Sequence, residues 1–143
     1  MCGIIGAATN RNAYKILIEG LHRLEYRGYD SAGVSIIDSH QQLQTRKTIG
    51  KVAKLEAVAK KSPAAGNTGI AHTRWATHGE PSTANSHPHT SGGISVVHNG
   101  IIENHEVLRQ EMINAGYDFL SATDSEVIAH LVNHYSKTEK DLR

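Results

Sequence analysis

The sequence predicts an α+β fold, in which strands and helices form layers around one hydrophobic core. Short apolar runs typical of strands occur in groups, and segments with helical hydrophobic spacing lie between those groups. The length of 143 residues fits one domain, and a chain of this size buries roughly 70% of the surface of its unfolded form. We therefore expect a single folded unit over residues 1–143.

The N-terminal segment predicts a buried strand followed by a helix. Residues 2–8 are apolar, and the glycines Gly3 and Gly6 suggest that another segment approaches this strand closely. Asn10 or Asn12 is suited to cap a helix that runs to about Arg27. Its apolar side chains recur at helical spacing: Tyr14, Leu17, Ile18, Leu21 and Leu24.

The middle of the chain predicts a β-hairpin, a second helix and a further strand. Strands are expected over 33–38 and 43–49, joined by a turn around 39–42. An amphipathic helix is expected over 52–61, because Ser62-Pro63 ends its pattern. A short apolar run then predicts a strand over 68–72.

Residues 73–93 predict a long loop, because they lack periodicity and carry many Gly, Pro, Ser, Thr and His residues together with the only tryptophan, Trp75. A loop of this length inside a compact domain is usually functional or disordered. The remaining elements are expected to be a strand over 94–98, a helix over 103–115 and a last helix after Thr123 and Asp124. The apolar face predicted for the last helix consists of Val127, Ile128, Leu131 and Val132.

Composition excludes several classes of function. The net charge of +1 gives no support for nucleic-acid binding, and no apolar run approaches the roughly 18 residues of a membrane helix. The first ten residues lack the basic region of a signal peptide, and the single cysteine cannot form an internal disulfide. We therefore expect a cytoplasmic protein with neither a nucleic-acid nor a membrane partner.

Cys2 is the first candidate catalytic residue, because it follows the initiator Met1 directly. After removal of Met1 it would carry a thiol of pKa about 8.5 and an α-amine of pKa about 7.7–8.0. One residue would then hold a nucleophile and a base, as in enzymes that work through their own N-terminus. The alternative is a small buried apolar residue in a strand, which is common for a free cysteine.

Three further positions admit both a structural and a functional interpretation. Asn99-Gly100 is either a tight hairpin turn or an oxyanion hole, made of the asparagine amide and the glycine N–H. Arg74 is either a surface residue or a two-pronged ligand for a carboxylate. Asp124 either favours a helix start or holds an ammonium group. If Arg74 and Asp124 share one pocket, their ligand is an amino acid.

The ten histidines raise the possibility of a metal site, with His72, His78, His87 and His89 as the ligands. The sequence has no HExxH or CxxC motif, and loop histidines often bond to backbone instead, so we expect no metal. The absence of a GxGxxG or P-loop motif likewise predicts no nucleotide cofactor. Arg27 and Asp30 are expected to pair as a brace near the N-terminus.

Six motifs occur in an order that resembles a known family. They are MCGIIG at 1–6, RLEYRGYDSAG at 23–33, GIAHTRWATHGEPS at 69–82, NSHPH at 85–89, HNGIIEN at 98–104 and TDSEVIAHL at 123–131. Together they resemble the N-terminal glutaminase domain of the glutamine–fructose-6-phosphate aminotransferases, or glucosamine-6-phosphate synthases. These are class II glutamine amidotransferases of the N-terminal-nucleophile hydrolase type.

The resemblance implies a mechanism. Cys2 would attack the side-chain amide of glutamine, its α-amine would transfer the proton, and Asn99 and Gly100 would hold the oxyanion. A γ-glutamyl thioester would form, and water would hydrolyse it. The remaining residues carried over by the resemblance are Arg74 for the α-carboxylate, Asp124 for the α-ammonium, Trp75, Thr77, His78 and His87 as pocket residues, and Arg27 as a structural brace.

The resemblance also implies a four-layer αββα sandwich, which we expect to be incomplete at its C-terminus because strands are few there. In the family, two sugar isomerase domains follow the glutaminase domain and use its ammonia to convert fructose 6-phosphate to glucosamine 6-phosphate. Those domains are absent from these 143 residues, and the full-length protein is expected to be a homodimer. No cofactor is implied. The alternative function is a catalytically silent, glutamine-binding fragment.

Overall fold

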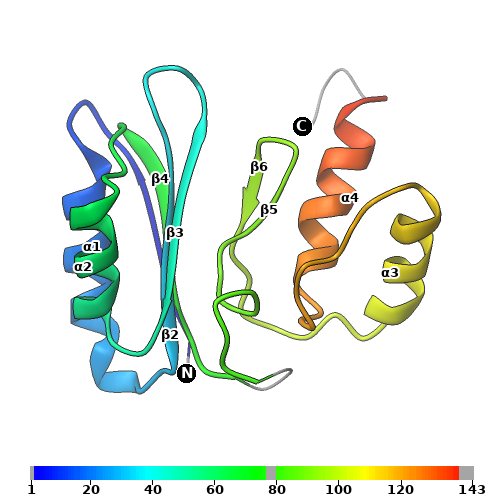
Figure 1. Cartoon of the computed structure of the whole chain (residues 1–143), viewed down its shortest axis with the longest axis horizontal. Helices are drawn as coiled ribbons and strands as arrows, with labels where there is room; N and C mark the ends of the chain where they lie inside the picture. Colours follow the sequence, from blue (N-terminus) through cyan, green and yellow to red (C-terminus); the bar gives the residue numbers. More distant parts are fainter. Residues whose placement is uncertain (1, 77–79, 139–143) are drawn as a thin grey trace.

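The computed structural model describes residues 2–76 and 80–138, which form four layers (Figure 1). Two helices, α1 (Ala13–Leu24) and α2 (Val52–Lys61), lie on the outer side of a four-stranded sheet. A two-stranded sheet of β5 (His89–Ser91) and β6 (Ile94–Val96) follows on the other side of that sheet. The helices α4 (Glu126–Ser136) and α3 (His105–Asn114) form the last layer. The predicted α+β class and αββα layering are confirmed.

The four-stranded sheet places the start of the chain beside the end of a distant strand. Its order is β1 (Gly3–Ala8), β4 (Thr68–Arg74), β2 (Ser31–Ile37) and β3 (Leu43–Ile49), with antiparallel neighbours throughout. Gly3 pairs with Thr73, and the Gly3 N–H donates a hydrogen bond of 3.1 Å to the Thr73 hydroxyl. Cys2 therefore lies next to the residues that follow β4.

The face of the sheet toward α1 and α2 is apolar. Asn12 caps α1, since its side-chain oxygen accepts a 3.0 Å hydrogen bond from the Tyr14 N–H. A short 3-10 helix, η1 (Glu25–Arg27), then continues α1. The core below these helices contains fully buried side chains from four elements: Leu17, Leu21, Val34, Ile36, Leu55 and Ala71.

The opposite face of the sheet approaches the second layer at a glycine. A Cβ atom placed on Gly33 of β2 would lie 2.1 Å from the main-chain oxygen of His87. The segment before β5 therefore packs directly on the sheet backbone, and only a residue without a side chain permits this approach. Side chains alternate along a strand, so His72 and Arg74 of β4 lie on this second face, whereas Ala71 faces the helices.

The structure corrects two predictions. The region 73–93, expected to be one loop, contains the end of β4 and the strand β5. The predicted apolar face of α4 is also wrong in part, because only Val127 of its four members is buried. The buried residues of α4 are Glu126, Val127, Ala129, His130 and Asn133. The buried face is partly polar, and two of its members, His130 and Asn133, form side-chain hydrogen bonds to β5.

Those bonds converge on a single hydroxyl of β5. The Ser91 Oγ lies 2.9 Å from the His130 Nδ1 and accepts a 2.9 Å hydrogen bond from the Asn133 amide.

Within residues 2–76 and 80–138, no helix has the length and apolar character needed to cross a membrane.

Candidate active site

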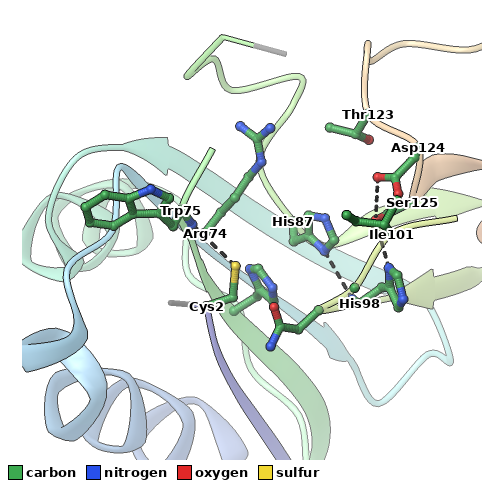
Figure 2. Close-up of a pocket in the computed structure, with 12 residues that line it drawn as sticks. Cys2, Arg74, Trp75, His87, His98, Ile101, Thr123, Asp124 and Ser125 are labelled. Carbon is green, nitrogen blue, oxygen red and sulfur yellow. Dashed lines mark hydrogen bonds between the residues drawn. The ribbon is translucent and has the colours of Figure 1, made fainter. Parts of the chain in front are cut away.

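A cavity of about 180 Å³ opens between the end of the four-stranded sheet and the layer of α4 (Figure 2). Four segments line it: the N-terminal Cys2, the end of β4, the loop at 98–101 after β6, and the residues at 123–125 before α4, with His87 beside them. Seven of the predicted site residues line this cavity: Cys2, Arg74, Trp75, His87, Asn99, Gly100 and Asp124. Thr77 and His78 lie outside the described residues.

Cys2 is half-buried at this cavity, and its sulfur accepts a hydrogen bond from the backbone. The Trp75 N–H lies 3.4 Å from the Cys2 Sγ, as the dashed line in Figure 2 shows. This hydrogen bond ties the Cys2 side chain to the turn that follows β4.

The turn that carries Trp75 is held by Asp30. The Asp30 N–H donates a 2.8 Å hydrogen bond to the Arg74 main-chain oxygen, and the Asp30 carboxylate accepts the Ala76 N–H. Gly28 supports the same turn, because a Cβ there would lie 2.7 Å from the Trp75 ring and its φ is +72°. Residues 27–30 thus fix the position of the Trp75 N–H, which contacts Cys2.

Arg27 projects from the same segment. Its side chain is exposed, and its Nε donates a 3.2 Å hydrogen bond to the Tyr26 hydroxyl. The carboxylate of Asp30, the predicted partner of Arg27, accepts a 2.9 Å hydrogen bond from the Ser31 hydroxyl. The predicted brace by Arg27 stays a prediction.

Arg74 and Asp124 come from distant parts of the chain and line the same cavity. Both are buried, with 5% and 6% of their surface exposed. Figure 2 shows them on different sides of the space above Cys2. One cavity therefore offers a cation and an anion to its ligand, a combination that matches the carboxylate and ammonium of an amino acid.

Asn99 and Gly100 are exposed and follow β6. The chain continues from them into α3 and does not return as a paired strand, so Asn99-Gly100 is not a β-hairpin turn. Both residues line the cavity that holds Cys2. Their position fits the second interpretation, in which the asparagine amide and glycine N–H act on a substrate oxygen.

Three buried histidines form a stack in the cavity wall, and two of them, His72 and His87, line the cavity. The rings of His72 and His87 are parallel with centroids 4.2 Å apart, and His89 meets His87 edge-on at 4.5 Å. Burial lowers the pKa of His72 to about 4 and that of His89 to about 3, and it lowers the pKa of His87 further. All three rings are therefore neutral at neutral pH.

The stack supports neighbouring loops through its nitrogens. The His87 Nδ1 accepts a 3.2 Å hydrogen bond from the His98 N–H, and the His89 Nε2 lies 2.9 Å from the Thr123 hydroxyl. His87 is thus bonded to the backbone that leads to Asn99. Among the residues the structure describes, no group of three His, Cys, Asp or Glu side chains is arranged to bind a metal ion.

Sequence reasoning did not nominate several of the cavity residues for the glutamine site. They are His72, His98, Ile101, Thr123 and Ser125. Each lies inside a motif that carries the family resemblance, within two residues of a nominated residue. Adjacency was the only signal available, because their contacts join segments that are far apart in the sequence.

The layered antiparallel fold and the cavity that places Cys2 near Asn99-Gly100 define the class: a glutamine amidotransferase domain of the N-terminal nucleophile type. Comparison with solved structures agrees with this class. The glutamine phosphoribosylpyrophosphate amidotransferase from B. subtilis, complexed with ADP and GMP, matches with a TM-score of 0.75 and 28% identity, over 93% of this chain and 29% of the other. A structure described as the allosteric regulatory enzyme of purine biosynthesis matches with a TM-score of 0.77 and 30% identity, with the same coverage.

The chain belongs to the glutamine amidotransferase family, whose domain description matches residues 72–142. It is similar to glutamine–fructose-6-phosphate aminotransferases (isomerizing): that of Haemophilus influenzae is 59% identical over 142 residues, covering 99% of this chain and 23% of the relative. The Yersinia pestis enzyme of the same name is 63% identical over 133 residues, covering 93% of this chain and 22% of the relative. The chain thus spans about a quarter of the length of these relatives.

Proposed function

We propose that this chain is a glutaminase domain that hydrolyses the side-chain amide of glutamine to glutamate and ammonia. The observation that carries the proposal is the convergence of Cys2, Arg74, Asn99-Gly100 and Asp124 on one cavity. These residues supply a nucleophile, two groups of opposite charge and two donors for an oxyanion. Glutamine presents a matching carboxylate, ammonium and carbonyl.

The chemical step uses Cys2 as both nucleophile and base. After removal of Met1, the α-amine of Cys2, with a pKa of about 7.7–8.0, accepts the thiol proton and passes it to the leaving nitrogen. The sulfur bonds to the amide carbon, and the Asn99 amide and Gly100 N–H stabilise the oxyanion. The C–N bond breaks, ammonia leaves, and water hydrolyses the γ-glutamyl thioester to glutamate.

Recognition of the substrate falls to the two buried charges. Arg74 binds the α-carboxylate with two parallel hydrogen bonds, and Asp124 binds the α-ammonium. Trp75, Thr77, His78 and His87 complete the pocket. Arg27 braces the N-terminal strand.

In the longer protein, the ammonia serves a sugar isomerase module. The relatives are named for glutamine and fructose 6-phosphate, and this chain spans about a quarter of their length. We infer that the full-length protein converts fructose 6-phosphate to glucosamine 6-phosphate in the cytoplasm, as a homodimer and without a cofactor. The described 2–76 and 80–138 segments account only for the glutaminase step.

The test combines turnover and binding. Glutamate release is measured for the processed protein and for Cys2→Ala, and glutamine binding is measured by calorimetry on both. The proposal predicts release by the parent protein, and binding without release by Cys2→Ala. Binding without release by the processed parent protein would favour the silent glutamine-binding domain, and release by Cys2→Ala would rule out Cys2 as the nucleophile.

A further inference from the structure

Ser125 occupies the N-cap position directly before α4, but its side chain does not cap the helix. A serine at this position usually accepts a hydrogen bond from a backbone N–H in the first turn. Here the side chain makes no such bond, and 4% of the residue is exposed. Its hydroxyl lies instead 3.0 Å from the His98 Nδ1 and 3.2 Å from the Asp124 Oδ1. This buried hydroxyl is therefore committed to the cavity wall.

The chemistry of the three groups fixes the direction of both hydrogen bonds. An ionised carboxylate only accepts, so the Ser125 hydroxyl donates its single proton to Asp124. The Ser125 oxygen then accepts from His98, which must carry a proton on Nδ1. The bonds form a chain that runs from His98 through Ser125 to Asp124.

The His98 ring transmits this chain to the predicted oxyanion hole. A Cβ atom placed on Gly100 would lie 2.7 Å from the His98 Nε2. The ring therefore contacts the backbone of Gly100 more closely than a side chain there would permit. Its orientation, set by Ser125, limits where the Gly100 N–H can lie.

Residues 124–125 also bond to the other end of the loop formed by residues 98–102. The Ile102 N–H donates a 2.7 Å hydrogen bond to the Asp124 Oδ2. Residues 124–125 thus bond to both ends of the 98–102 loop, and Figure 2 shows the bond between Ser125 and His98 as a dashed line. Asn99 and Gly100 lie between the two anchors and are exposed. Oxyanion donors act only within a narrow range of positions, so such a loop needs external anchors.

We infer that Ser125 is a positioning residue that sets the geometry of the oxyanion hole through His98. The inference rests on the proposed glutaminase function. This arrangement also connects substrate binding with catalysis. Asp124 is expected to hold the ammonium, and it accepts hydrogen bonds from the Ser125 hydroxyl and from the Ile102 N–H at the end of the loop. A change at Ser125 should therefore lower kcat more than it raises KM.

The test compares Ser125→Ala with two matched variants. Ser125→Thr keeps the hydroxyl. Ser136→Ala makes the same deletion at the far end of α4, where the Ser136 hydroxyl donates to the Asn133 main-chain oxygen. Glutamate release gives kcat and KM, and deuterium exchange gives the protection of the 98–102 amides. Because Ser125 makes no capping bond, its deletion should leave α4 folded.

The expected result for Ser125→Ala is a fall in kcat of about 10- to 100-fold with KM within about threefold, since the donors are displaced but not removed. Exchange over 98–102 should be faster, Ser125→Thr should recover most of kcat, and Ser136→Ala should resemble the parent protein. A kcat for Ser125→Ala equal to that of Ser136→Ala, or unchanged exchange over 98–102, would overturn the inference. If the parent protein shows no turnover, the proposed function fails, and the exchange data alone decide whether the anchor exists.

Discussion

The two faces of the four-stranded sheet are packed by different kinds of contact. Toward α1 and α2, the buried side chains are almost all aliphatic, with Leu17, Leu21 and Leu55 fully excluded from water. Toward α4, buried side chains are largely polar and joined by hydrogen bonds, as in the contacts of His89 with Thr123 and of His130 with Ser91. The sheet separates a core that supplies stability from a layer that positions chemical groups.

This difference teaches how the fold supports a site. Apolar contacts are non-directional and tolerate small shifts, so the helical side can stabilise the sheet without fixing single atoms. Hydrogen bonds depend on distance and angle, so the polar side fixes the loops around Cys2. The comparison predicts that substitutions on the helical side change stability, while those on the cavity side change turnover.

Leu21→Ala should give the largest effect on stability. The Leu21 side chain is fully buried in α1, and a Leu→Ala change in a core costs about 2–5 kcal/mol of unfolding free energy. Glutamate release per folded molecule should be unchanged, because Leu21 is outside the cavity. Urea unfolding and active-site titration measure the two quantities. A fall in turnover without a fall in stability would contradict the separation of the two faces.

Asn99→Ala should give the converse result. Removal of one oxyanion donor costs about 100- to 1,000-fold in kcat, or about 2.7–4 kcal/mol in the barrier. Asn99 is exposed, so the unfolding free energy should change little. Asn10→Ala, at another exposed asparagine, is the control. Parent-like kcat in Asn99→Ala would remove this residue from the mechanism.

Gly33→Ala lies at the contact between the two layers and should affect both properties. The added methyl would meet the His87 main-chain oxygen at 2.1 Å, so the segment before β5 must move. Overpacking of this kind typically costs about 1–3 kcal/mol. We expect lower stability in chemical unfolding together with lower kcat. Loss of stability with full activity would show that the His87 segment does not position the site.

Glu126→Gln should weaken the polar layer in a pH-dependent way. Burial alone raises the pKa of Glu126, but hydrogen bonds from the Leu120 N–H, the Ser121 N–H and the Ser121 hydroxyl outweigh it and hold the pKa below its usual value. Stabilisation by a carboxylate with a lowered pKa is present above the unfolded pKa and is lost as pH falls through the folded pKa. At pH 7 the free energy of unfolding of the parent protein should exceed that of Glu126→Gln by about 1–3 kcal/mol.

Unfolding of both proteins between pH 3 and pH 7 measures this difference. The gap should close toward the acid end, because the parent carboxyl becomes protonated there. A gap that stays constant across this range would exclude the carboxylate charge as its origin.

His22→Gln should give the smallest effect, on the outer surface of the helical side. A hydrogen bond to Glu25, and a further one to Glu56 of α2, raise the pKa of His22 although partial burial opposes the change. The stabilisation is present below the unfolded pKa of about 6.5 and is lost as pH rises through the folded pKa. Because 39% of the His22 side chain is exposed, we expect His22→Gln to lower the free energy of unfolding by about 0.2–1 kcal/mol at pH 5.5, measured by thermal unfolding. A larger loss at pH 9 than at pH 5.5 would contradict this sign.

The helical side of the sheet was largely predictable from the sequence. The predicted strand over 43–49 and helix over 52–61 match β3 and α2. The helix was predictable because Val52, Leu55 and Ala59, which are buried, recur at helical spacing. The polar side was less predictable. The strand β5 (His89–Ser91) and the buried face of α4 escaped prediction, because histidine, serine and asparagine carry no hydrophobic period.

The site followed the same division. Cys2, Asn99 and Arg74 were nominated from their chemistry and from the resemblance, and the structure brings them to one cavity. The contacts of Ser125 and Asp30 were beyond prediction, because each depends on distances between segments that only the folded chain defines. The sequence therefore indicates which groups are chemically useful, and the polar layer determines where they lie.

The most direct test of the central claim is intact-mass spectrometry before and after incubation with a glutamine-mimicking electrophile. If Cys2 is the nucleophile of an assembled glutamine site, the protein will have lost Met1 and will gain one adduct that maps to Cys2. Excess glutamine should slow its formation. A processed protein that gains no adduct, or an adduct that forms equally fast with and without glutamine, would contradict the proposal that this cavity binds glutamine beside a reactive Cys2.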